Sequence, residues 1–325
     1  MFLMDDRGKY SKYIYNLSFK GIFNMNMPKS INHDLAEIAQ KNRLSRIKLA
    51  DGASVPRIGQ GTWFMGESAA NREAEIAALR LGVELGMNLI DTAEMYGEGN
   101  AELLVGEAIK GIRDDVFLVS KVYPHNAGQD KMAASCEASL KRLGTDHLDL
   151  YLLHWRGNIP LAETVDSMEK LVEQGKIARW GVSNLDTEDM QELTRISKGT
   201  HCVTNQVLYH LGSRGIEYDL LPWHRSRNMP IMAYSPLAQA GSLRKGLLEN
   251  EAVAEIARDR QCSPLQVLLA WTIREGDVMA IPKASSLEHV LENASAGLIQ
   301  LTPEEVWKLD DAFQMPSWKV PLDMI

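Results

Sequence analysis

Short apolar segments alternate with longer amphipathic segments along the chain from about residue 46 onward. Residues 72–86 show the amphipathic type, because Ile76, Leu79 and Val83 recur on one helical face and Gly86 follows as a helix stop. The pattern repeats as strand–helix pairs. The expected strands cover residues 58–62, 88–91, 116–120, 148–153, 178–182, 202–206, 230–234 and 278–282, and the expected helices cover residues 72–86, 100–110, 129–142, 161–174, 186–196, 216–227, 250–260 with 263–274, and 287–295.

Eight consecutive strand–helix pairs predict an α/β fold of the (β/α)8 TIM-barrel type. A doubly wound sheet is the rival architecture, and its nucleotide-binding form carries G-x-G-x-x-G after the first strand. The sequence has no such run. No Pro-rich or Gly/Ser-rich linker divides residues 46–325, so we expect one barrel domain after an N-terminal extension over residues 1–45.

Two elements are expected outside the repeat. The alternating residues 46–49 and 54–56 flank Asp51-Gly52, which predicts a β-hairpin, and we place it at the barrel floor. Thr302, with Pro303 after it and Glu305 three residues on, predicts the start of an extra C-terminal helix outside the barrel. We expect the tail over residues 315–325 to fold over the barrel mouth.

The extension over residues 1–45 lacks the periodicity of the barrel and has no secretory signal pattern. Three interpretations are open. The segment is a loosely ordered extension, it contains a small accessory helix around residues 34–41, or it is translated noncoding sequence upstream of a later Met that is the true start.

Composition narrows the class of partner. The net charge of -8 and the absence of a basic run argue against nucleic acid or an anionic membrane surface, and favour a small molecule. The three cysteines are far apart, which predicts neither a disulfide framework nor a zinc site. No window of about 20 apolar residues occurs. We expect a cytoplasmic monomer without a metal.

Chemically distinctive side chains follow three consecutive predicted strands. Because the carboxyl ends of barrel strands meet at one mouth, we expect these side chains to share one site. An ammonium beside a phenol favours the phenolate, a carboxylate holds that ammonium, and an imidazole can orient a carbonyl oxygen. One such residue at a strand end is often an ordinary loop or capping residue, but the set predicts proton donation to a carbonyl. Its members are Asp91, Tyr96, Lys121 and His154.

The later strand ends carry groups suited to a flat, amide-bearing ligand. Ser183, Asn184 and Gln206 offer a hydroxyl and two amides, which suit a carboxamide, and Tyr234 offers a ring face for stacking. The alternative for Ser183 and Asn184 is capping of the next helix. Lys283 stands where the last barrel helix begins, a position that attracts anions.

Two tryptophans follow strand ends directly. Trp63 comes after the first strand and Trp155 after the fourth, next to His154. An aromatic wall at these positions would hold a small aldehyde and exclude water, although a tryptophan at a barrel mouth can also pack a loop. We favour the pocket for both.

Taken in order, these motifs resemble the aldo-keto reductase family. Two loop stretches, residues 208–218 and 236–241, resemble the bacterial members of that family that reduce methylglyoxal. The motifs that carry the family resemblance are Gly61-Thr62-Trp63, Asp91-Thr92-Ala93-Glu94-Met95-Tyr96, Val119-Ser120-Lys121, Leu152-Leu153-His154-Trp155, Gly181-Val182-Ser183-Asn184, Asn205-Gln206, Tyr234-Ser235-Pro236-Leu237 and Ile281-Pro282-Lys283.

The resemblance implies a (β/α)8 barrel that reduces small aldehydes such as methylglyoxal with NADPH and no metal. It implies that Tyr96 donates the proton, that Lys121 lowers the pKa of Tyr96, that Asp91 pairs with Lys121, and that His154 orients the carbonyl. The implied cofactor contacts are Ser183, Asn184, Gln206, Tyr234, Ser235, Leu237, Lys283, His289, Glu292 and Asn293.

The sequence departs from the family pattern at the expected phosphate contacts. The usual Arg falls on His289 and the usual Ser falls on Ala284. A mostly neutral imidazole is a weaker phosphate partner than a guanidinium. We therefore expect Lys283, helped by Ser285, to carry the preference for NADPH, with NADH as a weaker alternative.

Two alternative functions stay open at this point. One keeps the chemistry and takes sugar-derived ketones or aldoses as substrates. The other is a cofactor-binding regulatory subunit with little turnover.

Overall fold

Eight parallel strands form the centre of the computed structural model, which describes residues 35–129, 131–239 and 241–325. The strand order is β10-β9-β8-β7-β6-β5-β4-β3, so each strand pairs with its neighbour in the sequence. The strands are β3 (Gln60–Gly61), β4 (Leu89–Asp91), β5 (Phe117–Val122), β6 (Leu150–Leu153), β7 (Trp180–Ser183), β8 (Asn205–Leu208), β9 (Ile231–Tyr234) and β10 (Val278–Ala280).

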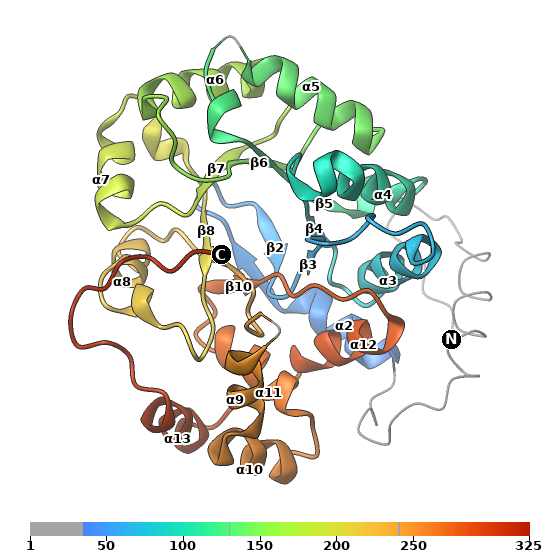
Figure 1. The fold of residues 1–325 in the computed structure, drawn as a ribbon, viewed down its shortest axis with the longest axis vertical. Coiled ribbons are helices and arrows are strands. Elements are labelled where there is room, and N and C mark those ends of the chain that lie inside the picture. The colour runs from blue at the N-terminus through green and yellow to red at the C-terminus, as the bar shows by residue number, and fades with distance from the viewer. Residues whose placement is uncertain (1–34, 130, 240) are drawn as a thin grey trace.

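Backbone hydrogen bonds between the first and last strands close the sheet. The amide of Gly59 donates to the carbonyl of Ala280 at 2.8 Å, and the amide of Gly61 donates to the carbonyl of Pro282 at 3.1 Å. A closed parallel sheet has no free edge. The predicted (β/α)8 barrel is confirmed, and Figure 1 shows the ring of helices around the strands.

The helices pack their apolar faces against the outside of the barrel, in one large core cluster. They are α3 (Arg72–Glu84), α4 (Asn100–Ile109), α5 (Met132–Leu143), α6 (Leu161–Glu173), α7 (Thr187–Arg195), α8 (Leu220–Arg225), α9 (Ser242–Glu249), α10 (Glu251–Asp259), α11 (Pro264–Thr272) and α12 (Leu287–Ala296). In the described part of the chain, no helix is both long and apolar enough to cross a membrane.

The predicted hairpin is confirmed. Strands β1 (Arg46–Lys48) and β2 (Ser54–Pro56) pair antiparallel, with Ile47 opposite Val55. These two side chains join the inner cluster that contains Leu89 and Phe117, the first residues of β4 and β5. Because those residues lie at the amino ends of the strands, the hairpin fills the barrel floor.

The extra C-terminal helix is also confirmed, as α13 (Pro303–Ala312). The hydroxyl of Thr302 accepts from the amide of Glu305, whose carboxylate accepts from the amide of Thr302. An ion pair between Lys308 and Glu255 ties α13 to α10, and Figure 1 shows the two helices side by side, away from the strands.

The accessory helix expected around residues 34–41 is present as α2 (Leu35–Leu44). Ile38 is fully buried, and the amide of Asn42 donates to the carbonyls of Leu85 and Ala294 at 3.0 Å each. This helix therefore packs on α3 and α12. Residues 1–34 lie outside the described residues, so the predicted division at residue 45 stays a prediction.

Some predicted boundaries differ from the structure. The helix expected over 216–227 is a 3-10 turn, Gly215–Glu217, followed by the short α8. The non-helical backbone of Asp219 (φ -142°) separates the two. The strand expected over 278–282 is shorter and ends at Ala280. Pro282 has no N–H to donate to a neighbouring strand. Helix α9 was not expected, and Leu247 is its one buried residue.

Candidate active site

Asp91, Tyr96 and Lys121 meet at the carboxyl ends of β4 and β5. The Lys121 ammonium donates to Asp91 Oδ2 at 2.7 Å, to the Tyr96 hydroxyl at 3.0 Å and to the carbonyl of Thr92 at 2.9 Å. Lys121 is 0% exposed and Asp91 2%. The alternation along β5 turns Lys121 to the barrel interior, and Tyr96 follows β4 as the first residue of a short 3-10 turn, Tyr96–Gly99.

The buried lysine remains charged. Burial alone lowers the pKa of Lys121, but the neighbouring Asp91 and Tyr96 outweigh it and raise the pKa above its usual value. Burial raises the pKa of Asp91, against the opposing effects of Lys121 and of the hydrogen bond from Gln206. The site therefore holds a fixed positive charge beside the phenol.

Tyr96 keeps its proton in this arrangement. Burial raises the pKa of Tyr96, and the Lys121 charge opposes that effect without cancelling it. The sequence-based expectation was right about the effect of the lysine but did not include the larger effect of burial. Because the phenol oxygen accepts from Lys121, its own O–H is available to donate to a ligand.

His154 follows β6 directly and lies beside the phenol. Its ring centroid is 5.7 Å from that of Tyr96, at an interplanar angle of 76°. Burial, and then the Lys121 charge, lower the pKa of His154 to about 2, so the imidazole is neutral. Its buried Nδ1 has no hydrogen-bond partner among the described residues. A neutral ring offers one N–H donor and one acceptor.

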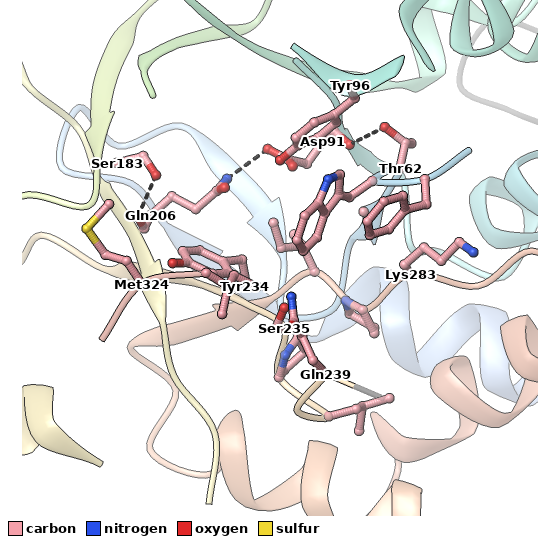
Figure 2. Close-up of a pocket in the computed structure, with 18 of the residues that line it drawn as sticks. Thr62, Asp91, Tyr96, Ser183, Gln206, Tyr234, Ser235, Gln239, Lys283 and Met324 are labelled. Carbon is pink, nitrogen blue, oxygen red and sulfur yellow. Dashed lines mark hydrogen bonds between the residues drawn. The ribbon is translucent and has the colours of Figure 1, made fainter. Parts of the chain in front are cut away.

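These groups line a cavity of about 480 Å³ at the barrel mouth (Figure 2). Asp91, Tyr96 and His154 lie in its wall, and Lys121 lies behind them. Trp63 and Trp155 both line it, as the sequence indicated. The cavity opens at the carboxyl ends of the strands, where barrels of this type carry their active sites.

A row of polar side chains runs along one wall, from β7 to β9. The Tyr234 hydroxyl donates to Asn184 Oδ1 at 2.9 Å, and Asn184 Nδ2 lies 3.2 Å from Ser183 Oγ. Ser183 Oγ in turn donates to the carbonyl of Gln206 at 2.8 Å, and Figure 2 shows Ser183, Gln206 and Tyr234 along this wall. All four predicted residues of the row line the cavity, as do Ser235, Leu237 and Lys283.

The remaining predicted cofactor residues lie on α12 and do not line the cavity. His289 is exposed, and Asn293 is buried. The carboxylate of Glu292 accepts from Ser263, the N-cap of α11. The structure does not bring these three side chains to the cavity wall, and their role at an adenine or phosphate group stays a prediction.

Several lining residues were missed or only weakly indicated from the sequence. Phe64 stacks on Trp63 at a ring separation of 4.5 Å and has a left-handed backbone (φ 61°), a conformation rare for an aromatic residue. The tail contributes Met324 and Ile325, which confirms that it folds over the mouth. Gln239 also lines the cavity; it lies in the loop over residues 236–241, whose resemblance was noted but to which no cavity role was assigned. Arg244, on α9, was missed.

Comparison with known proteins agrees with this geometry. The model of the "Aldo/keto reductase family" matches residues 57–313. The chain belongs to the aldo/keto reductase family. "Methylglyoxal reductase YeaE" of Escherichia coli (strain K12) is 60% identical over 279 residues, which is 86% of this chain and 98% of that relative.

Two further relatives extend the comparison. "Glyoxal reductase" of Bacillus subtilis (strain 168) is 33% identical over 267 residues, covering 81% of this chain and 91% of that relative. A solved aldo/keto reductase from Klebsiella pneumoniae, in complex with NADP and acetate, is 58% identical with a TM-score of 0.85 and covers 86% of this chain and 99% of that one. The family resemblance seen in the strand-end motifs is therefore confirmed.

Proposed function

We propose that this aldo/keto reductase is an NADPH-dependent reductase of small aldehydes, methylglyoxal among them. The observation that carries the proposal is the 3.0 Å contact between Lys121 Nζ and the Tyr96 hydroxyl, at the wall of an aromatic cavity. Additional support comes from the relatives, one a methylglyoxal reductase and one crystallised with NADP.

The cavity residues fit a nicotinamide cofactor. Ser183 and Asn184 present a hydroxyl and an amide beside Tyr234, whose ring face suits stacking on a flat heterocycle. Lys283 supplies a positive charge at the same cavity. When bound, the reduced nicotinamide would supply a hydride to the carbonyl carbon of the substrate.

The protein's own contribution is to protonate the carbonyl oxygen. Tyr96 donates its phenolic proton, and the adjacent Lys121 ammonium stabilises the phenolate that remains. Asp91 holds Lys121 in place, and neutral His154 can donate an N–H to the substrate oxygen and align it with Tyr96. Trp63 and Trp155 exclude water from the reacting groups.

The loss of NADPH absorbance with a panel of carbonyl compounds tests this function. We expect faster oxidation with methylglyoxal and other small aldehydes than with aldoses or diketo sugars. Activity confined to the sugars would favour the alternative sugar reductase, and tight nucleotide binding without turnover on any carbonyl would favour a regulatory subunit.

The location and assembly state are part of the proposal. We propose a cytoplasmic monomer, and the free thiols of Cys136, Cys202 and Cys262 fit a reducing compartment. Light scattering on the purified chain tests the monomer, and a mass near twice 36.3 kDa would contradict it.

A further inference from the structure

Two positively charged side chains of the cavity wall form no ion pair with a described residue. Of the described side chains that line it, only Asp91, Arg244 and Lys283 are charged, and Asp91 is paired with Lys121. Ile325, the last residue, also lines the cavity, and its carboxylate forms no ion pair with Arg244 or Lys283. Lys283 lies 3.5 Å from the hydroxyl of Ser285 and forms no ion pair with a described residue. Arg244 has neither a hydrogen bond nor an ion pair with any described residue.

Most of the described arginines have such partners, and Arg195 and Arg258 are the others without them. Arg142 and Arg260, for example, each bind a carboxylate within 2.6 Å. A guanidinium that is partly buried in a cavity wall loses hydration and is stabilised by an anion that restores its hydrogen bonds. In a protein of net charge -8, two free cations in one cavity therefore indicate an anionic ligand.

Arg244 and Lys283 follow neighbouring strands of the barrel, and one of these strands, β9, also carries Tyr234 of the polar row. Lys283 follows β10 and Arg244 lies in α9, which follows β9, and these two strands are neighbours in the barrel. Figure 2 shows Lys283 across the cavity from Ser183 and Gln206, with Tyr234 between them. A dinucleotide whose nicotinamide lies on Tyr234 would extend its phosphates toward this end.

We propose that Arg244 is a phosphate-binding residue of the cofactor site, acting together with Lys283. The inference rests on the proposed use of a nicotinamide dinucleotide. The planar donors of a guanidinium match phosphate oxygens. His289, at the position from which the family resemblance implies a phosphate contact, is exposed and does not line the cavity.

A matched control lies next to Arg244. Lys245 is on the same helix, its side chain is 72% exposed, it pairs with Glu249 at 3.7 Å, and it does not line the cavity. Lys245→Ala removes the same unit of charge from α9 without removing a cavity residue. Arg244→Lys keeps the charge but removes the fork of donors.

The test is nucleotide binding by the full chain, measured through quenching of tryptophan fluorescence with NADPH and NADH and through calorimetry with 2′,5′-ADP. We expect Arg244→Ala to weaken NADPH binding about 10-fold. Arg244→Lys should lose less affinity for NADPH than Arg244→Ala does. Lys245→Ala should bind NADPH with wild-type affinity. Unchanged thermal unfolding of Arg244→Ala would show that the variant is folded.

The pattern of losses identifies the phosphate. A loss for NADPH and 2′,5′-ADP but not NADH assigns Arg244 to the 2′-phosphate, and equal losses for NADPH and NADH assign it to the pyrophosphate. If Arg244→Ala binds both dinucleotides with wild-type affinity, the inference is overturned and the proposed function is unaffected. A raised KM of this variant for a carboxylate-bearing carbonyl substrate would not rescue the inference. A wild-type protein that binds neither dinucleotide would overturn the proposed function and the inference with it.

Discussion

The amide nitrogen of Gln206 donates a 2.7 Å hydrogen bond to Asp91 Oδ1 across the barrel, from β8 to β4. The other oxygen of this carboxylate accepts from Lys121, so Asp91 is bound on both sides. Gln206 was expected only as a cofactor contact. Its bond to Asp91 links the polar row of the proposed nicotinamide site to the group that holds the charge beside Tyr96.

Gln206→Ala should therefore reduce turnover as well as cofactor affinity. The substitution leaves a buried carboxylate oxygen without its donor, which raises the pKa of Asp91 further and weakens its hold on Lys121. We expect kcat to fall about 10-fold. Steady-state kinetics at saturating NADPH measure this effect separately from cofactor binding. The exposed Gln174→Ala serves as the control, and a kcat equal to wild type would show that the bond to Asp91 has no catalytic consequence.

Three buried histidines should make stability depend on pH. Burial lowers the pKa of His154 to about 2 and those of His210 and His224 to about 4, so all three are neutral in the folded protein. Unfolded histidines bind protons below a pKa of about 6.5. The unfolding free energy should therefore be highest above pH 6.5 and fall below it, by up to about 1.4 kcal/mol per pH unit for each histidine.

Urea unfolding at pH 7 and pH 5 measures this dependence. His224→Gln should reduce the difference between the two midpoints, whereas replacement of the exposed His125 by Gln should leave it unchanged. Equal midpoints for the wild type at the two pH values would contradict the neutral state of these rings.

His289→Arg should strengthen NADPH binding. His289 lies exposed in the first turn of α12, where a guanidinium would be free to reach a phosphate and form charge-assisted hydrogen bonds. We expect NADPH to bind about 10-fold tighter, with the affinity for NADH unchanged. Fluorescence titration with the two cofactors checks this, and unchanged NADPH affinity would dismiss the position as a phosphate contact.

Asn42→Ala should destabilise the barrel although residue 42 precedes the first barrel element. The side-chain amide of Asn42 satisfies the carbonyls of Leu85 and Ala294, and both bonds are buried. Removal leaves two buried acceptors unpaired, which costs about 1–3 kcal/mol of unfolding free energy. Chemical denaturation measures the change. A variant with wild-type stability would mean that these two hydrogen bonds contribute nothing to the stability of the fold.

The sequence predicted the barrel because each strand–helix pair carries its own local pattern of apolar residues and stops. The same logic located Asp91, Lys121 and His154, since each stands at or just after the end of a strand and the fold brings strand ends together. Contacts between distant elements had no such signal. The bond between Gln206 and Asp91 joins residues 115 positions apart, and nothing local to either residue indicates it.

Other features were missed for a similar physical reason. The left-handed backbone of Phe64 (φ 61°) runs against the intrinsic preference of an aromatic residue, so its residue type does not indicate it. Arg244 lies on α9, in which only Leu247 is buried, and it does not stand at a strand end. The balance of pKa shifts at Tyr96 also depends on burial, which single residue types do not report.

The most direct test of the central claim is the turnover of Tyr96→Phe with NADPH and methylglyoxal. The variant removes only the hydroxyl that Lys121 contacts, so the fold and the nucleotide affinity should be retained. We expect kcat to fall by about 10²–10⁴-fold with the Kd for NADPH unchanged. A kcat close to wild type would contradict the assignment of Tyr96 as the proton donor.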